Sequence, residues 1–292
     1  MKTVSVVIPA KNEEPSIGKL VQELKATLTD SSLLSQYRLD EIIVVNDAST
    51  DNTALHAKES GARVVNHPYS KGNGAAIKSG ARTASSDIIV FMDGDGQHQP
   101  KDIPNLLSKL DEGYEMVVGA RTDKSQASFG RKIANKIYNK FASYMTGHKV
   151  SDLTSGFRAV NRDKFLEFIH LLPNGFSYPT TSTMAFFRAG YSVAYIEITA
   201  LQRSGKSHIQ PLKDGIRFLL IIFKIGTLYS PLKLFVPISA AVFLTGLSYY
   251  AYTFITASRF TNMSALMFTT ALVIFMVGLV SEQITTLTYK KS

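Results

Sequence analysis

The stretch Val90-Phe91-Met92-Asp93-Gly94-Asp95-Gly96-Gln97-His98 decides the predicted fold. The apolar run that ends at Met92 predicts a short buried strand, and two carboxylates one residue apart follow it. Because alternate side chains of an extended chain point the same way, Asp93 and Asp95 are expected to face one direction. Two hard oxygen ligands at a strand end suit Mg²⁺ or Mn²⁺ that keeps other positions for phosphate oxygens. An isolated Asp-Gly-Asp is also typical of a plain turn, so the rest of the chain has to decide.

Strands and helices alternate on both sides of this stretch. Short apolar runs predict strands, and stretches with apolar residues three and four apart predict the helices between them. This alternation is typical of an α/β fold with a doubly wound, mostly parallel sheet. Ligands of such sheets bind beyond the carboxyl ends of the strands, where the polar clusters of this chain fall. The predicted strands are 4–8, 42–45, 62–65, 88–92, 115–118, one in 151–163 and 193–198, with helices from 12–16 onward and near 75–77, 102–110, 129–144 and 164–170.

The last third of the chain differs in composition from the rest. No charged side chain occurs in 234–258 or in 260–281, and each run is long enough to cross a bilayer as a helix. The helix predicted at 211–228 carries three cations on one side and is apolar on the other, which favours a helix lying along the membrane surface over a soluble core helix. Glu282, just beyond the second apolar run, is expected at the cytoplasmic interface.

These patterns predict three parts of the chain. They are an α/β domain at 1–210, an interfacial amphipathic helix at 211–230, and a two-helix transmembrane hairpin with a short tail at 231–292. The apolar run at the amino terminus is too short for a signal peptide and fits the first strand. Lys290 and Lys291 close the chain, and the tendency of basic residues to stay inside favours cytoplasmic ends. The expected location is a cell membrane or an endomembrane, crossed more than once, with the α/β domain on the cytoplasmic side.

Charge and cysteine content narrow the function classes. The formal net charge is +9, yet the chain lacks the arginine-rich arm or basic–aromatic stripe typical of nucleic-acid binding, so no nucleic-acid partner is expected. Attraction to anionic lipid and to phosphorylated substrates accounts for the basic balance. The chain contains no cysteine, which excludes disulfides and thiolate chemistry.

Three polar clusters near the predicted strands each have a structural and a functional interpretation. Asn12 and Glu13 suit either an acidic helix start or a binding loop. Asp47 stands in a stretch that either forms a capping turn or accepts hydrogen bonds from a base or ribose. The turn Lys71-Gly72-Asn73-Gly74 is either a phosphate cradle at a helix amino terminus or a tight turn. It lacks the P-loop spacing, and no dinucleotide fingerprint follows the first strand, which disfavours ATPases and dehydrogenases.

Cations and hydroxyls later in the chain suit phosphate binding. Arg203-Ser204-Gly205-Lys206-Ser207 places two cations and two hydroxyls around a flexible glycine, just before the helix expected at the membrane surface. Arg121, Arg131 and Arg158 are either surface charges or part of phosphate recognition. His98, directly after the aspartate pair, is either a ligand or a solvated loop residue.

In order and together, these clusters resemble the inverting family 2 glycosyltransferases of GT-A fold. Among them they resemble the polyprenyl-phosphate glycosyltransferases, of the dolichol-phosphate mannose synthase and undecaprenyl-phosphate glucosyltransferase kind. The resemblance covers about residues 3–210, and the apolar tail is similar to subfamilies with two spans. The matching motifs are Pro9-Ala10-Lys11-Asn12-Glu13-Glu14, Val45-Asn46-Asp47-Ala48-Ser49-Thr50-Asp51, Lys71-Gly72-Asn73-Gly74, Asp93-Gly94-Asp95-Gly96-Gln97, Gly119-Ala120-Arg121, Asp152-Leu153-Thr154-Ser155-Gly156-Phe157-Arg158 and Arg203 to Ser207.

The resemblance implies a donor site at the strand ends. Asp93, Asp95 and Gln97 would surround Mg²⁺ or Mn²⁺ on the diphosphate. One departure concerns the usual pair of aspartates before the small turn, which is Asn46-Asp47 here and affects contacts to base and ribose. The residues that would line the nucleotide pocket are Pro9, Ala10, Asn12, Glu13 and Asp47, with Lys71 and Gly72 added as substrate-binding residues from the turn.

The resemblance also implies an acceptor site. Arg121 and Arg131 would face the acceptor phosphate, and Arg203 would reach phosphate as well, next to Lys206 and Ser207. No Q-x-x-R-W element occurs and there are too few spans for a channel, which disfavours a processive polysaccharide synthase. The predicted catalytic residues are Asp95, Asp152, Arg121 and Arg131, with Asp152 as a base or a positioning group.

The enzyme implied moves a hexose from a UDP- or GDP-sugar to a dolichyl or undecaprenyl phosphate, with inversion at the anomeric carbon. Its expected partners are the nucleotide-diphospho-sugar, the polyprenyl phosphate and the lipid bilayer, and homo-oligomerisation is left open. Because a phosphate acceptor is already anionic, positioning by arginines can suffice without a strong base. One alternative is transfer to the hydroxyl of another lipid or lipid-linked glycan, which requires a base. The other is a non-catalytic, membrane-tethered nucleotide-sugar-binding protein.

Overall fold

The computed structural model describes residues 1–29, 36–122, 129–175, 177–199, 220, 223–224 and 226–289, without the side chains of 129–134. The chain divides into two compact units. The first consists of Met1–Ser143 and His148–His208, and the second of Tyr144–Gly147 and Ile209–Ser292. Each unit is described separately below.

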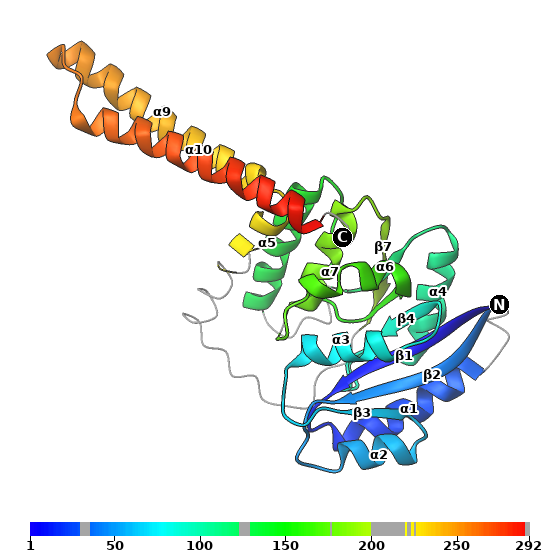
Figure 1. The fold of residues 1–292 in the computed structure, drawn as a ribbon. Coiled ribbons are helices and arrows are strands. Elements are labelled where there is room, and N and C mark those ends of the chain that lie inside the picture. Colours follow the sequence, from blue (N-terminus) through cyan, green and yellow to red (C-terminus); the bar gives the residue numbers. More distant parts are fainter. Residues whose placement is uncertain are drawn as a thin grey trace. The chain divides into compact units, whose positions relative to one another are not determined.

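The strands of the first unit form a mixed, mostly parallel sheet. Those in the described residues are β1 (Lys2–Ala10), β2 (Tyr37–Asn46), β3 (Arg63–Asn66), β4 (Ile88–Phe91), β5 (Met116–Arg121), β6 (Arg158–Asn161) and β7 (Val193–Ile198). Their order in the sheet is β3-β2-β1-β4-β6-β5-β7 (Figure 1). Only β6 runs antiparallel to its neighbours, β4 and β5, among these described strands. The predicted α/β fold with a mostly parallel sheet is confirmed.

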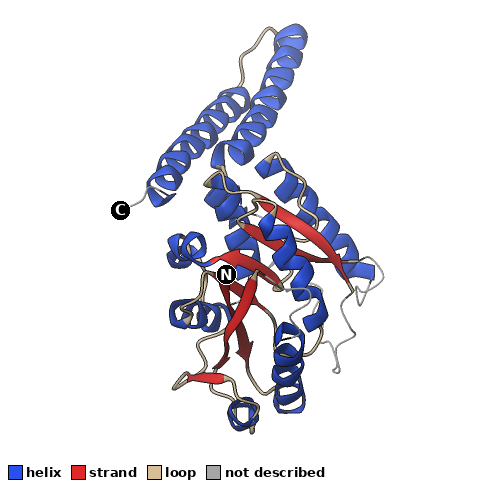
Figure 2. Cartoon of the chain, turned by 90° about the vertical axis from the view of Figure 1, so that its right-hand side faces the viewer, coloured by secondary structure: helices blue, strands red, loops and turns tan. Residues whose placement is uncertain are grey.

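Helices cover both faces of this sheet, and Figure 2 shows them around the strands. The helices described in the first unit are α1 (Glu14–Thr29), α2 (Thr53–Glu59), α3 (Asn73–Thr83), α4 (Ile103–Asp111), α5 (Phe129–Thr146, of which 144–146 belong to the second unit), α6 (Arg162–Glu167) and α7 (Tyr178–Arg188). Val6 and Ile8 of β1 share one buried cluster with the apolar sides of α1 and α4. Val7 points to the opposite face, because side chains alternate along a strand. There α3 packs so closely that a Cβ on Gly80 would lie 2.2 Å from Val7 Cγ1.

Helix α7 is absent from the sequence-based assignment of 151–210, which expects a strand, one helix and further strands. Its four consecutive hydroxyl residues, 180–183, favour turns and caps over helix interiors, because their side chains compete for backbone groups. In the structure they are buried, and Thr183 Oγ1 donates back to Pro179 O at 2.8 Å. Ser182 Oγ and Thr183 Oγ1 also accept hydrogen bonds from Arg158, which ties α7 to β6.

The second unit contains two long helices, α9 (Pro231–Ala257) and α10 (Asn262–Tyr289), which lie side by side as a hairpin in Figures 1 and 2. Their most apolar windows have mean hydropathies of 1.6 and 2.3, so each is long and apolar enough to cross a membrane by length and composition. They cover the two predicted apolar runs. α9 begins slightly before the first run, and α10 continues beyond the second.

Small residues seven positions apart form the contact between α9 and α10. Ser239 Oγ donates to Ala271 O at 2.7 Å, and a Cβ on Gly246 would lie 2.8 Å from Met267 Cβ. A repeat of seven residues keeps one side of each helix against its neighbour, and small side chains allow the backbones to approach. The buried positions of this repeat are Ser239, Gly246 and Thr253 on α9, and Ser264, Ala271, Gly278 and Thr285 on α10.

Glu282 lies within α10 and reaches the start of α9. The backbone N–H of Leu232 lies 3.4 Å from Glu282 Oε2, within hydrogen-bonding range. The first N–H groups of a helix have no partner within the helix and carry a partial positive charge. The carboxylate of Glu282 therefore stabilises the amino end of α9.

The predicted division at 210 and 230 stays a prediction. The interfacial helix expected at 211–230 falls largely outside the described residues, of which 220, 223–224 and 226–229 are helical. The boundaries of the α/β domain and of the hairpin are therefore retained as part of the functional proposal below.

Candidate active site

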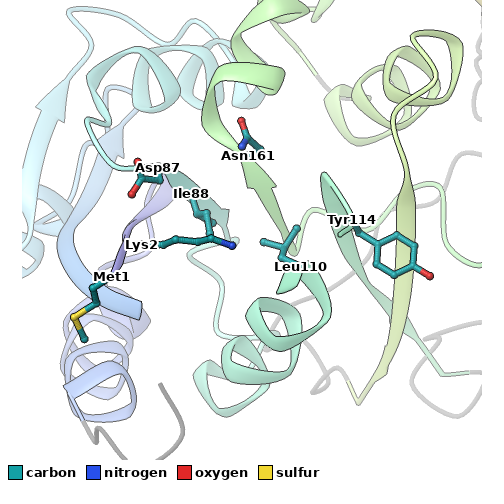
Figure 3. Close-up of a pocket in the computed structure, with 7 residues that line it drawn as sticks. All are labelled: Met1, Lys2, Asp87, Ile88, Leu110, Tyr114 and Asn161. Carbon is teal, nitrogen blue, oxygen red and sulfur yellow. The ribbon is translucent and has the colours of Figure 1, made fainter. Parts of the chain in front are cut away.

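A cavity of about 340 Å³ lies at the amino ends of β1 and β4 (Figure 3). The residues that line it are Met1, Lys2, Asp87, Ile88, Leu110, Tyr114 and Asn161. The polar clusters singled out in the sequence lie at the other ends of the same strands, since β1 ends at Ala10 and β4 ends two residues before Asp93. The carboxyl edge is where parallel sheets bind ligands, so the candidate site is this edge and not the cavity.

Two loops at the carboxyl ends of β1 and β2 are joined by hydrogen bonds through Asn12. Asn12 N donates to Ser49 Oγ at 3.0 Å, and Thr50 N donates to Asn12 Oδ1 at 2.9 Å. Asn12 and Ala48 both have a φ of 56°, a left-handed conformation that is uncommon for residues other than glycine. Asn12 thus connects the two loops from a constrained backbone position, as residues at binding sites often do.

The other residues predicted to line the nucleotide pocket lie at the same edge. Ala10 ends β1 and is buried, and a Cβ on Gly94 would lie 3.3 Å from Pro9 O, so the aspartate loop runs directly past the end of β1. Glu13 N donates to Thr53 Oγ1 at 2.9 Å. The structure therefore brings these residues together, and their contacts to a nucleotide stay predictions.

The Asp47 carboxylate is engaged by four donors of the chain. Its Oδ1 lies 2.7 Å from His67 Nδ1 and 2.8 Å from Lys71 N, and its Oδ2 accepts from Ser70 Oγ at 2.8 Å and from Gly72 N at 2.9 Å. Burial raises the pKa of Asp47, but these hydrogen bonds outweigh it and lower the pKa to about 2. Four donors fill the acceptor positions of a carboxylate. Asp47 therefore shapes the loop, and a contact to base or ribose stays a prediction that would require one of these bonds to give way.

His67 is a buried residue of this edge that the sequence patterns did not single out. Its Nε2 lies 2.9 Å from Ser79 Oγ, so the ring connects the end of β2, through Asp47, to α3. The sequence signal that could have identified His67 is its position directly after the strand 63–66, at the same sheet edge as the other polar clusters.

Backbone N–H groups of the turn Lys71-Gly72-Asn73-Gly74 are bonded within the chain. The N–H groups of Lys71 and Gly72 are bonded to Asp47, as described above. At the start of α3, Gly74 N donates to Gly175 O at 3.0 Å and Ala75 N donates to Asn174 O at 2.9 Å. Four N–H groups of this turn and of the start of α3, those of Lys71, Gly72, Gly74 and Ala75, are thus used within the chain. These bonds favour the tight-turn interpretation, and the substrate-binding roles of Lys71 and Gly72 stay predictions.

Gly74→Ala is expected to destabilise the first unit by about 1–3 kcal/mol, because overpacking forces backbone shifts. A Cβ at this position would lie 2.0 Å from Pro173 O and 2.7 Å from Gly175 O, both backbone atoms. Gly175→Ala is the matched control, since no atom lies within 4 Å of its Cβ position. Its expected change is within about 0.5 kcal/mol. Urea unfolding of the full chain in detergent, followed by circular dichroism, measures both, and equal stability of the two variants would contradict this packing.

Asp93 and Asp95 follow β4 as predicted, and Asp93 lies against the loop 152–156. A Cβ on Gly156 would lie 2.8 Å from Asp93 Oδ2. The Asp93 side chain is 33% exposed, and no hydrogen bond reaches its carboxylate from the described residues; His98 Nδ1 lies 3.9 Å from its Oδ2. Burial raises the pKa of Asp93, the charge of His98 lowers it and that of Asp95 raises it, with a net upward shift.

The donor set at this loop fits a divalent cation of the Mg²⁺ or Mn²⁺ kind. Asp93 and Asp95 supply carboxylate oxygens, the ligands that such cations prefer. Gln97 lies on the same loop, and its N–H donates to Asp95 Oδ1 at 3.1 Å. No group of three or more His, Cys, Asp or Glu side chains arranged for a metal occurs in the part of the chain that the structure describes. The phosphate oxygens of a nucleotide would therefore have to complete the coordination.

Arg121 and Asp152 form a bidentate ion pair. Arg121 Nε donates to Asp152 Oδ2 at 2.8 Å and Nη2 to Oδ1 at 3.1 Å, and Nη2 also donates to Thr154 Oγ1 at 2.6 Å. Asp152 further accepts from the backbone N–H groups of Arg121, Thr154 and Ser155. Burial raises the pKa of Asp152, but the hydrogen bonds and charge of Arg121 bring it below its ordinary value. Asp152 is thus an ionised carboxylate with its oxygens occupied, which suits a positioning group for Arg121 better than a base.

Arg158 is fully buried, so its interpretation as a surface charge is wrong. Its guanidinium donates to Ser182 Oγ at 2.8 Å and to Ser155 O, and no ion pair joins it to a carboxylate among the described residues. Burial lowers the pKa of Arg158 from its high ordinary value. On β6 it pairs with Phe91. A buried positive charge therefore lies on β6 opposite Phe91, two residues before Asp93.

The remaining predicted site residues cannot be placed. Arg131 is part of α5, but its side chain is outside the described part of the chain. Arg203, Lys206 and Ser207 lie outside the described residues altogether. Their roles at the acceptor phosphate stay predictions.

Comparison with known proteins agrees with this geometry. The sequence model described as glycosyl transferase family 2 matches residues 5–168, and the model described as the GtrB C-terminal hairpin matches residues 230–287. Glycosyltransferase AglJ of Haloferax volcanii is 28% identical over 299 residues, which cover 97% of this chain and 94% of that protein.

Solved structures are similar in fold over about three quarters of the chain. The glucosyl-3-phosphoglycerate synthase of Mycobacterium tuberculosis in complex with Mn²⁺, UDP and glucosyl-3-phosphoglycerate has a TM-score of 0.59 and 25% identity, covering 77% of this chain and 78% of that one. The same enzyme in complex with Mg²⁺ and UDP has a TM-score of 0.58 and 26% identity, covering 76% and 79%. Both complexes contain a divalent cation of the kind that the aspartate loop fits.

Proposed function

The chain belongs to glycosyl transferase family 2, and from this premise we propose that it transfers a hexose from a UDP- or GDP-sugar to a polyprenyl phosphate at a membrane. The proposed donor site is the edge formed by the ends of β1, β2 and β4. The proposed acceptor site is on the side of Arg121, Asp152 and α5. The sugar and the prenol, dolichyl or undecaprenyl, are not specified by these residues.

The observation that carries the acceptor class is the pairing of Asp152 with Arg121. A hydroxyl acceptor needs a base to remove its proton as it attacks. Asp152, the predicted base, accepts two hydrogen bonds from the guanidinium of Arg121 and others from backbone N–H groups. A phosphate acceptor is already ionised near neutral pH, and needs mainly a cation to hold it. An arginine fixed by Asp152, a carboxylate whose oxygens are already occupied, therefore favours a phosphate over a hydroxyl.

In the proposed reaction the bond between the anomeric carbon and the diphosphate breaks as an oxygen of the acceptor phosphate attacks from the opposite face. The configuration at the anomeric carbon is thereby inverted, and negative charge grows on the leaving diphosphate. A divalent cation held by Asp93, Asp95 and Gln97 would supply Lewis-acid stabilisation of that charge, of several kcal/mol. Arg121, oriented by Asp152, offsets the repulsion between the acceptor phosphate and the diphosphate.

The second unit supports a lipid-borne acceptor. The match of residues 230–287 to the GtrB C-terminal hairpin covers both apolar helices, which are long enough to span a bilayer. We include in the proposal two membrane passes, a catalytic domain at 1–210 and an interfacial helix at 211–230, with the catalytic domain on the cytoplasmic side. A prenyl chain could then stay in the lipid while its phosphate reaches the sheet edge.

The alternatives have less support. Transfer to a lipid hydroxyl would need a base other than Asp152, because the oxygens of that carboxylate are occupied. A non-catalytic binder of nucleotide sugars has no need for a buried bidentate arginine pair beside an aspartate pair that fits a cation. The property to test is therefore transfer to an acceptor phosphate, and not donor binding alone.

The proposal predicts transfer to prenyl phosphate and not to the matching free prenol. Membranes that contain the full chain are incubated with radiolabelled UDP- and GDP-sugars and Mn²⁺ or Mg²⁺, and the lipid product is extracted. The loss of a charge-assisted phosphate contact costs about 1.5–3 kcal/mol, so at least a ten- to hundredfold difference between the two acceptors is expected. Equal use of the free prenol would overturn the acceptor class, and hydrolysis of donor without any lipid product would overturn the transfer.

Arg131→Ala tests the acceptor site in the same assay. It is expected to lower use of prenyl phosphate by about ten- to a hundredfold while nucleotide-sugar affinity is kept. Lys136→Ala, which removes an exposed cation from the same helix, is the matched control and should change neither. A defect of Arg131→Ala confined to nucleotide binding would contradict its acceptor role.

A further inference from the structure

His98 is a buried residue with a nitrogen that has no partner. The residue is 6% exposed, and its Nδ1 makes no hydrogen bond. The ring lies flat on Phe157, with 5.1 Å between ring centroids and 15° between planes. Buried polar atoms are nearly always hydrogen-bonded, so an unpaired ring nitrogen held in one orientation requires an explanation.

The unpaired nitrogen faces the Asp93 carboxylate. Nδ1 lies 3.9 Å from Asp93 Oδ2, just beyond hydrogen-bonding distance, and no other donor of the described residues bonds that carboxylate. Two more buried atoms without partners, Ser155 Oγ and Arg158 Nε, belong to residues on either side of Phe157. Unpaired buried polar atoms thus occur both on His98 and in the segment that carries Phe157, the ring on which His98 stacks.

We propose that His98 is a positioning residue for Asp93, donating Nδ1–H to the carboxylate and fixing the direction in which it faces the cation. A carboxylate can only accept, so Nδ1 must carry the hydrogen in this contact. The Phe157 stack holds the ring, and a movement of less than 1 Å closes the 3.9 Å gap to a charge-assisted hydrogen bond. Groups that orient a ligating carboxylate typically change metal affinity by about ten- to a hundredfold when removed.

This inference rests on the cation site of the proposed function and goes beyond it. His98 touches neither sugar nor phosphate in this role, and it acts through Asp93. Two other roles are distinguishable from it. If the ring served only to pack on Phe157, a phenylalanine would replace it. If Nδ1 bound the cation directly, a nitrogen would be detected in the coordination sphere.

The test is Mn²⁺ binding to the purified full chain in detergent, measured from the electron paramagnetic resonance signal of free Mn²⁺, with and without UDP or GDP. His98→Phe keeps the stacked ring and removes the donor, and it is expected to weaken Mn²⁺ affinity by about ten- to a hundredfold. His98→Asn keeps an N–H near the position of Nδ1 and should stay within about threefold of the unmodified chain. His148→Phe is the matched control, because His148 stacks on Phe187 at 5.3 Å and 9°. It should not change Mn²⁺ affinity.

Unchanged affinity in His98→Phe would overturn the inference, and so would equal losses in folded His98→Phe and His98→Asn. A ¹⁴N coupling from the His98 ring in the pulsed spectrum of bound Mn²⁺ would replace positioning by direct ligation. Sugar transfer by the unmodified chain is measured in parallel. If transfer to prenyl phosphate fails while His98→Phe still weakens Mn²⁺ binding, the acceptor proposal is wrong and the role of His98 stands. If the unmodified chain binds no Mn²⁺, the role of His98 is wrong even where transfer persists.

Discussion

Asp95→Asn is expected to lower sugar transfer by about a thousandfold while the chain stays folded. The substitution removes one of the two carboxylates proposed to hold the cation, and a lost stabilisation of about 4 kcal/mol in the transition state corresponds to a thousandfold in rate. Folding should be retained, because an asparagine oxygen can still accept the hydrogen bond that Gln97 N donates to Asp95 Oδ1 at 3.1 Å. The measurement is transfer of labelled sugar to prenyl phosphate at saturating Mn²⁺.

Asp163→Asn is the control for removal of one negative charge, since the Asp163 side chain is 85% exposed and lies outside the candidate site. It should transfer sugar at the unmodified rate. Chelation of divalent cations should abolish transfer by the unmodified chain. Normal turnover by Asp95→Asn in the presence of chelator would remove the cation from the proposed mechanism.

Asp152→Asn is expected to destabilise the first unit by about 3–5 kcal/mol and to raise the KM for prenyl phosphate. Loss of one partner of a buried ion pair leaves the other charge without compensation. The Asp152 side chain is 5% exposed and pairs with Arg121 at 2.8 Å, so the geometry of that arginine depends on it. Urea unfolding gives the stability, and acceptor titration at saturating donor gives the KM.

The stability effect of Asp152→Asn should depend on pH. The pKa of Asp152 is lower in the folded chain than in the unfolded chain. Its contribution is therefore complete above about pH 4 and is lost as the pH falls through the folded-state pKa. The difference in stability between the unmodified chain and the variant should accordingly stay constant from about pH 6 to about pH 4 and shrink as the pH is lowered further.

A double-mutant cycle with Arg121→Ala separates a positioning role from a base. If Asp152 acts through Arg121, the variant with both Asp152→Asn and Arg121→Ala should lose little more acceptor use than Arg121→Ala alone. The coupling energy between the two substitutions should then be about 0.5–3 kcal/mol. A general base would give an independent loss of kcat and would remove the acidic limb of the pH–rate profile. Additive losses together with that change in profile would favour a hydroxyl acceptor.

The elements that carry the site were predictable because their apolar patterns are local and uninterrupted. Five apolar residues spaced three or four apart (one pair adjacent), Ile17, Leu20, Val21, Leu24 and Leu28, are the buried residues of α1. The apolar run before Asp93 is β4, and the two uncharged runs are α9 and α10. Each of these patterns predicts burial directly, because the spacing of its apolar residues and the length of its apolar run lie within one continuous segment.

The segment from β6 to α7 was not predictable for the opposite reason. β6 has four residues, and nothing in them indicates that it runs antiparallel between β4 and β5. The hydroxyl run of α7 becomes acceptable in a helix because Arg158 supplies donors to Ser182 and Thr183 from a distant strand. Partners that lie far apart in the sequence leave no local pattern.

The candidate site shows the same limit. The motifs identified which residues gather at the edge, including Asn12, Asp47, Asp93, Arg121 and Asp152. They did not indicate which of these bond to one another. Asp47 is occupied by the turn beside it, and Asp152 by Arg121. A motif records the residue type at a position, whereas the partner of a carboxylate depends on how separate loops meet.

The cap on α3 also has a consequence for the order of folding. Gly74 N bonds to Gly175 O, so the cap joins positions 101 residues apart, from 74 to 175. Such distant contacts are slow to form, because the intervening chain must first be brought together. During synthesis the parallel strands β1 to β4 can pair early, while the start of α3 waits for residue 175 to leave the ribosome. The start of α3 is therefore completed late, and a nascent chain shorter than this has β1 to β4 before α3 is capped.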